Sequence, residues 1–402
     1  MQYNLPKHLA EKSIALPEFS PKKRKKDWRG KPASWPDIRK NAQDGHIYLL
    51  VDTRYPIGFT ATTTDGYSVK IDGVAYDNYE NNAQFSIADW SEYSATDGYD
   101  INQPEGATKA HIIDIYPQSA SDNITAFKCQ RVAASGTEAQ GLLWAHFNIS
   151  NQIALTNFTS VEGTQYTNTL LEAITAKSNK LLVSSLYSAF ASCYALEYLP
   201  LLDGNNSSLQ APAAFRSCRK LKSITLKNMT ITSCYFAFYE CYLLEEIKCS
   251  NALIQPTATT KDIPAVYSRC FALKATMPTT LHSAIQRMDN YITQAESLQD
   301  TVIDVSNITD LKTIGCYGSS SYFMGGLKGL RVSNEAPFDN ATAPQINVSY
   351  TGMDRQALVQ LFNDLPTVSA GQIINIVGCA GTVDLTADDE TIATAKGWTI
   401  TK

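Results

Sequence analysis

The 402-residue sequence has none of the long apolar runs that cross or target membranes. No stretch approaches about 18 consecutive apolar residues, so a transmembrane helix is not expected. The first residues, MQYNLPKHLAEKSIALPEF, contain no apolar core of the kind that a secretory signal needs. The sequence as it stands therefore predicts neither membrane insertion nor export through a signal peptide.

The usual marks of disulfide frameworks and of catalysis are also missing. The nine cysteines are odd in number and form no C-x-x-C pair, which favours a reducing compartment and buried thiols. None of the five histidines lies in a recognised nucleophile arrangement, and ASGTEAQG at 134–141 is not G-x-S-x-G. GCYGSSSYFMGG at 315–326 lacks the lysine of a phosphate-binding loop. We therefore expect no catalytic residue, no metal and no cofactor.

Positive charge is scarce except near the amino terminus. Residues 1–40 carry eleven Lys and Arg against four acidic residues, so they hold +7 and the remainder holds −12 of the total of −5. A basic arm on an acidic body predicts that residues 1–45 are extended and order only against an acidic partner. A nucleic-acid ligand is the alternative to such a partner, and we expect none. The anchoring residues predicted in this arm are Lys22, Lys23, Arg24, Lys25, Lys26, Trp28, Arg29 and Trp35.

Residues 46–160 have the pattern of β-strands separated by tight turns. HIYLLVDT at 46–53 has the composition of a buried strand, and the sequence then alternates around Asp65-Gly66 and Asp72-Gly73. This spacing predicts a small antiparallel sandwich or barrel.

A repeat follows in the centre of the chain. AFASCYALEYL (189–199), AFRSCRKLKSI (214–224) and AFYECYLLEEI (237–247) share an aromatic, a cysteine, a leucine and an aliphatic residue at fixed spacing, and YSRCFALKATM (267–277) is a partial copy. The steps between the cysteines are 25, 23 and 29 residues, a period that predicts a leucine-rich-repeat solenoid over 161–340. The residues expected in its stacked core are Phe190, Cys193, Leu196, Phe215, Cys218, Leu221, Phe238, Cys241, Leu244, Cys270 and Leu273.

Metal ligation is the alternative explanation for the recurring cysteines. Zinc sites need cysteine pairs about two to four residues apart in one loop, whereas these cysteines recur once per repeat. We therefore expect them to pack in the interior, where cysteine behaves as a small hydrophobic residue.

The last part of the chain changes to a helix–strand alternation. DRQALVQLFND at 354–364 is amphipathic, QIINIVG at 372–378 is strand-like, and ADDETIATAK at 387–396 follows the capping residue Thr386. We expect residues 341–402 to form an α/β cap that closes the open end of the solenoid.

These segments resemble known families. AFRSCRKLKSI is similar to the A-F-x-x-C-x-x-L-x-x-I core of BspA-like leucine-rich repeats, found in bacterial, protozoan and bacteriophage surface proteins. MDRQALVQLFNDLP and LTADDETIATAKGWTI together resemble a terminal module of gut bacteria and of the tail- or head-fibre proteins of their phages. DWRGKPASWPDIRKN is similar to the virion-attachment arms of such fibres. The resemblance implies adhesion and carries no catalytic residues.

The predicted fold is mixed α/β and multi-domain, with a β-rich amino-terminal domain, a leucine-rich-repeat solenoid and an α/β cap. We expect a non-enzymatic phage fibre or capsid-decoration protein, made in the host cytoplasm and homo-oligomeric. Its arm would bind other virion proteins and its repeats a host glycan or protein. A bacterial cell-surface adhesin is the alternative, and a glycan-processing enzyme is the third. The tyrosines expected to form the ligand surface are Tyr235, Tyr239, Tyr242 and Tyr267.

Overall fold

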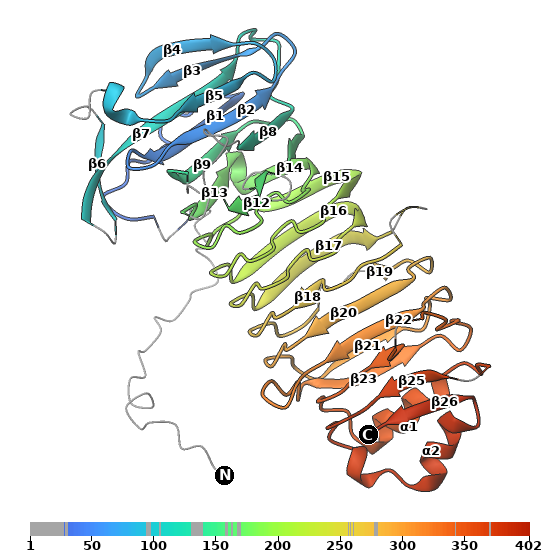
Figure 1. Ribbon diagram of the computed structural model, residues 1–402. Helices are drawn as coiled ribbons and strands as arrows, with labels where there is room; N and C mark the ends of the chain where they lie inside the picture. Colours follow the sequence, from blue (N-terminus) through green and yellow to red (C-terminus); the bar gives the residue numbers. More distant parts are fainter. Residues whose placement is uncertain are drawn as a thin grey trace.

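The molecule is elongated, with β-sheets at its amino-terminal end, stacked parallel coils in the middle and two α-helices at the other end (Figure 1). The described part forms a β-solenoid of about nine turns. The computed structural model describes residues 28, 31–93, 98–103, 106–129, 140–156, 160–161, 164–166, 170–255, 257, 259, 261–276, 280–341, 343–369 and 371–402.

The first sheet is buried on both faces, which explains the continuous apolar run of its central strand. Ile47, Leu49 and Val51 face the main hydrophobic core, while Tyr48 and Leu50 face a second apolar cluster on the opposite side. All pairs in this sheet are antiparallel except that of its first and second strands. Its order is β13 (Ala173–Ala176), β9 (Leu142–Asn148), β1 (His46–Asp52), β7 (Gly106–Pro117), β3 (Tyr67–Ile71) and β4 (Val74–Tyr79), with β6 (Tyr99–Gln103) also on β7.

The second sheet runs from the amino-terminal region into the solenoid without a break. Its first three strands pair antiparallel, and every later pair is parallel. Its order is β5 (Gln84–Ile87), β2 (Ile57–Thr62), β8 (Ala126–Cys129), β10 (Ile153–Leu155), β14 (Lys180–Ser185), β15 (Leu201–Gln210), β16 (Ser223–Ser233), β17 (Glu246–Ile254) and β19 (Thr280–Leu281). The second sheet and the main core therefore contain residues from both sides of the predicted boundary at 160/161.

The later coils build a second parallel sheet, which ends beside the helices. Its order is β18 (Tyr267–Ser268), β20 (Arg287–Thr293), β22 (Thr313–Tyr317), β24 (Ile346–Asn347), β25 (Gln372–Asn375) and β26 (Trp398–Thr401). The remaining pairs are β21 (Thr301–Val305) with β23 (Leu327–Val332), and β11 (Ser160–Val161) with β12 (Thr164–Tyr166). The short 3-10 helices are η2 (Trp90–Glu92), η3 (Lys177–Asn179) and η4 (Thr382–Asp384).

The aromatic column of the repeat forms a continuous stack through the solenoid core. The ring centroids of Phe190, Phe215, Phe238 and Tyr267 are 5.6, 5.4 and 5.6 Å apart in succession. The eleven residues expected in the repeat core are all buried. Burial of each large apolar side chain contributes about 1.5–3 kcal/mol, so stacking coil on coil stabilises units that could not fold alone.

An asparagine row bends the strands at one corner of the coils. Asn228 and Asn251 lie in the middle of β16 and β17 with φ of 50° and 52°, a left-handed conformation that asparagine tolerates better than most residues. The Asn251 amide donates to Asn228 Oδ1 at 3.0 Å, and the Asn228 amide donates to Asp203 Oδ1 at 3.3 Å. Hydrogen bonds between coils therefore satisfy the polar groups at the bend.

Two α-helices form where the sequence pattern places them. α1 (Arg355–Asp364) buries Leu358, Leu361 and Phe362, and α2 (Ala387–Thr394) begins with a capping box between Thr386 and Asp389. Arg355 donates to Asp389 at 2.8 and 2.9 Å, which joins the start of one helix to the start of the other.

The tryptophans of the predicted arm are not available to a partner, which corrects that prediction for Trp28 and Trp35. Both side chains are buried, at 5% and 3% exposure, in the cluster on the outer face of the first sheet. Trp28 packs edge-on against Trp144, with a centroid distance of 5.4 Å. Residues 31–45 therefore pack against the first sheet of the same chain. Burial of the two indoles stabilises this position, whereas the proline-rich sequence predicted an extended arm.

Candidate functional site

The outward-facing positions of the repeat turn carry arginines and aromatic residues. In AFRSCRKL, the Phe, Cys and Leu side chains point inward, so Arg216 and Arg219 are exposed. Equivalent positions in neighbouring coils place further rings and charges beside them. We call this set the arginine–aromatic surface; it comprises Tyr194, Arg216, Arg219, Phe236, Tyr239, Glu240, Tyr242, Arg269, Phe271 and Tyr322.

One row of this surface crosses successive coils. The Arg219 guanidinium lies between two rings, 4.4 Å from the Tyr194 centroid and 5.3 Å from the Tyr242 centroid. Phe271 then packs between Tyr242 and Tyr322, with centroid distances of 5.3 and 5.4 Å. The row arises because the residue that follows each buried repeat cysteine points outward at the same place in every coil.

A second group of contacts joins this row to three neighbouring charges. The guanidinium groups of Arg216 and Arg269 lie 5.3 and 5.7 Å from the centroid of Tyr239. Arg269 also donates to Glu240 at 2.8 Å, and Ser217 donates to the same carboxylate at 3.1 Å. The Tyr239 phenol and then Glu240 raise the pKa of Arg269 above its ordinary value, so this guanidinium stays charged.

Exposed apolar side chains extend the surface toward the later coils. Leu243 directly follows Tyr242 and is 45% exposed. Tyr322, which ends the row of rings, and the next residue, Phe323, are 39% and 46% exposed. Large apolar side chains that remain exposed next to one another are typical of recognition surfaces.

Two of the four predicted ligand tyrosines, Tyr239 and Tyr242, belong to this surface, and Tyr235 packs edge-on against Phe236 beside it. Tyr235, Tyr239 and Tyr242 are partly exposed, and Tyr235 hydrogen-bonds with Tyr187. The prediction for Tyr267 is wrong. Its ring is fully buried and continues the phenylalanine stack, while its hydroxyl group hydrogen-bonds with Tyr291 in the core.

The basic residues predicted to anchor the chain, Lys22, Lys23, Arg24, Lys25, Lys26 and Arg29, lie outside the described residues. Trp28 and Trp35, predicted with them, lie in the apolar cluster against Trp144.

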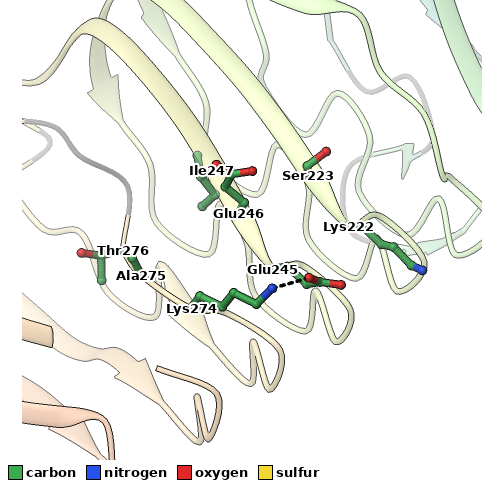
Figure 2. A pocket seen from close by; sticks show the side chains of 8 residues that line it. All are labelled: Lys222, Ser223, Glu245, Glu246, Ile247, Lys274, Ala275 and Thr276. Atoms are coloured by element: carbon green, nitrogen blue, oxygen red, sulfur yellow. Dashed lines mark hydrogen bonds and ion pairs between the residues drawn. The ribbon is translucent and has the colours of Figure 1, made fainter. Parts of the chain in front are cut away.

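A shallow groove of about 740 Å³ lies between neighbouring coils (Figure 2). Lys274 and Glu245 form an ion pair of 2.7 Å at its edge, and Lys222, Glu246 and Thr276 complete much of its lining. Its charges are nearly balanced, and exposed pairs of this kind contribute little energy.

The thiols of the repeat are buried in a protonated form that reacts slowly. Burial raises the pKa of Cys241 to about 12 and the pKa of Cys218 and Cys270 well above the ordinary value, so these groups stay protonated. Within the described ranges, no three His, Cys, Asp or Glu side chains gather in a way that could hold a metal ion, and no helix is long and apolar enough to cross a membrane.

Comparison with protein families identifies the repeats. Residues 143–263 and 187–320 match the family described as BspA type Leucine rich repeat region, in six copies. Over these residues the chain carries BspA-type leucine-rich repeats. The BspA-type match begins at residue 143, on strand β9, and so starts before the repeat region that the cysteine spacing predicts. Neither curated proteins nor solved structures give a match.

Several residues of the arginine–aromatic surface were missed from the sequence. Arg216 and Arg219 lie within AFRSCRKLKSI, and Phe271 follows Cys270. The sequence prediction named the inward-facing repeat residues and four tyrosines, so it omitted these three. The register of the repeat carries their signal: Arg219 and Phe271 directly follow the buried cysteines Cys218 and Cys270, and Arg216 directly follows the buried Phe215. Tyrosine identity alone was a weaker guide, because it also selected the buried Tyr267.

Proposed function

We propose that this chain is a non-enzymatic adhesion protein whose recognition site is the arginine–aromatic surface. The observation that carries the proposal is the row from Tyr194 through Arg219, Tyr242 and Phe271 to Tyr322 on BspA-like repeats. Arginine and tyrosine are the residue types that contribute most to binding energy at interfaces. The rigid coils hold them in place, so less entropy is lost on binding.

A protein that adheres through its repeats also needs a second site that attaches it to its own particle or cell. The basic run Lys22–Lys26 is suited to that attachment. The run Lys22–Lys26 ends two residues before Trp28, which is fixed against Trp144. An acidic partner could therefore be held close to the first sheet, far along the molecule from the later coils (Figure 1). We propose a phage fibre or capsid-decoration protein, homo-oligomeric and bound to other virion proteins through this run; a bacterial surface adhesin accounts equally well for the repeats.

A matched pair of tyrosine substitutions tests the recognition site. Tyr322 and Tyr99 are 39% and 41% exposed, but only Tyr322 belongs to the arginine–aromatic surface. Fluorescently labelled full-length protein should adhere to host bacteria or mucin, and Tyr322→Ser combined with Tyr242→Ser should weaken adhesion by about tenfold. Tyr99→Ser should leave it unchanged. Equal effects at both places would place the adhesive site elsewhere.

Deletion of residues 1–27 tests the attachment site without removing Trp28. The shortened chain keeps the buried tryptophan cluster and should remain folded. Loss of retention on purified phage particles would support the virion assignment. If neither chain is retained on particles and both bind bacterial cells, the surface-adhesin alternative is correct.

A further inference from the structure

Two guanidinium groups of the arginine–aromatic surface are held in place by rings and form no hydrogen bond with a carboxylate of the described residues. Arg216 is exposed, lies over Tyr239 and forms no ion pair among the residues that the structure describes. Arg219 is 44% exposed, and its nearest carboxylate oxygen, on Glu240, is 4.0 Å away, too far for a hydrogen bond. Ring contacts restrict both side chains, so their N–H donors are prepared for an anionic group.

The rings of the row contact one another and the Arg219 guanidinium. Tyr194 and Tyr242 contact Arg219 from its two sides, and Phe271 packs between Tyr242 and Tyr322. A neutral sugar that packs on an aromatic ring needs an open face, whereas Tyr242 and Phe271 each already contact two neighbours. Ring edges carry partial positive charge, and they lie here beside guanidinium and phenol groups. The surface therefore favours negative oxygen atoms.

Charge and shape together indicate the class of ligand. Arg219 and Arg269 lie beside the carboxylate of Glu240, and Arg216 lies over the neighbouring Tyr239, so this surface is locally positive although the whole chain has a net charge of −5. We propose that the arginine–aromatic surface binds a polysaccharide that carries carboxylate groups. Arginine pairs with carboxylates in a bidentate manner, and a linear polymer can contact several coils at once. This inference deepens the proposed adhesion function and rests on it.

Binding of full-length protein to polygalacturonate, measured by biolayer interferometry, tests the proposal. The wild-type protein should bind, and its affinity should fall as ionic strength rises. Arg216→Gln with Arg219→Gln should reduce affinity about tenfold or more, because two charge-assisted contacts are lost. Arg216→Lys with Arg219→Lys keeps the charge but removes the planar fork, and should lose most of the same affinity. This second variant also provides the test if the glutamine variant does not fold.

Two control variants separate this site from general attraction between charges. Arg287→Gln with Lys248→Gln removes two cations that are 44% and 43% exposed and lie outside the surface. A second control replaces all five basic residues of the run Lys22–Lys26 with Gln. Both controls should keep wild-type affinity for polygalacturonate, and fully methyl-esterified polygalacturonate should bind at least about tenfold more weakly.

Three results would overturn the proposal. Unchanged affinity in both arginine variants would exclude the site, as would loss of affinity in the variant of residues 22–26. Binding to dextran sulfate as tight as to polygalacturonate would show a general polyanion site and exclude recognition of carboxylates. If the protein adheres to cells through Tyr242 and Tyr322 but not to polygalacturonate, the ligand class is wrong while the adhesion function stands.

Discussion

The thiol of Cys241 donates a hydrogen bond to the main-chain carbonyl oxygen of Phe215 in the preceding coil, with a sulfur–oxygen distance of 2.9 Å. Cys218 makes the equivalent contact with Phe190 at 3.0 Å. Alanine would leave the space of the sulfur atom empty, and neither alanine nor valine could donate. Cysteine therefore suits this column because it is small, apolar and still able to satisfy a buried carbonyl group.

Replacing that thiol should destabilise the solenoid. Cys241→Ala removes both the donor and the volume of the sulfur atom, and we expect the free energy of unfolding to fall by about 1–3 kcal/mol. Urea denaturation followed by circular dichroism measures the change. Cys249→Ala is the matched control, since Cys249 is only partly buried on β17, and its effect should stay below about 0.5 kcal/mol. Equal losses would show that the contact between coils contributes nothing specific.

The nine thiols should differ in reactivity in the folded protein. Burial raises the pKa of Cys249 to about 11 and that of Cys234 and Cys316 to about 12, so little thiolate exists at pH 8. A disulfide reagent should modify Cys249 first, faster as pH rises, and the other cysteines only after addition of guanidinium chloride. Mass spectrometry locates the modified residues. Rapid modification of Cys234 in folded protein would contradict its burial.

The repeat register could be predicted from the sequence because every coil has the same packing requirement. One aromatic, one cysteine and one leucine per turn must face inward, so Phe215, Cys218 and Leu221 recur in columns. Tyr267 shows the limit of this reasoning. Its place in the aromatic column of the repeat predicts a buried ring, whereas its hydroxyl group suggests exposure. Tyr291, from a different coil, hydrogen-bonds with that hydroxyl group in the core and so allows its burial. Contacts of that kind cannot be read from one repeat.

Contacts over a long sequence separation account for the remaining differences. A charged, proline-containing segment predicts an extended arm, but Trp28 and Trp144 meet across more than a hundred residues of chain. The sheet that joins β2 to β15 likewise depends on β8 and β10 pairing in parallel, which local patterns do not reveal. Arg219 was visible in the sequence, yet its position between Tyr194 and Tyr242 required three coils to be in place.

His146 should make stability fall in mild acid. Burial, and then the charge of Arg39, lowers its pKa from 6.5 to about 4, so the folded state resists a proton that the unfolded chain accepts. The stability of the neutral form is complete above pH 6.5 and decreases as pH falls toward 4, by at most about 3 kcal/mol. Urea midpoints between pH 7 and 4 measure the loss. His146→Gln should flatten this pH dependence, and an unchanged slope would assign it to other groups.

Removing the tryptophan contact should release the segment that covers the first sheet. Trp28→Ala with Trp35→Ala takes two indoles from the cluster around Trp144, at a cost of about 3–5 kcal/mol for each buried ring, more than a short surface segment can lose and stay docked. Trypsin should then cleave after Arg39 and after Lys40 much faster than in the wild type, while the solenoid stays intact.

Trp90→Ala is the matched control for this release, because Trp90 is also buried but packs in the main core. It should lower overall stability without speeding cleavage after Arg39 or Lys40. The double variant should also raise the pKa of His146 toward its ordinary value, which NMR titration of the imidazole would detect, since Arg39 would no longer lie beside it. If cleavage stays slow and the pKa of His146 stays low in the double variant, the segment is held by contacts other than its tryptophans.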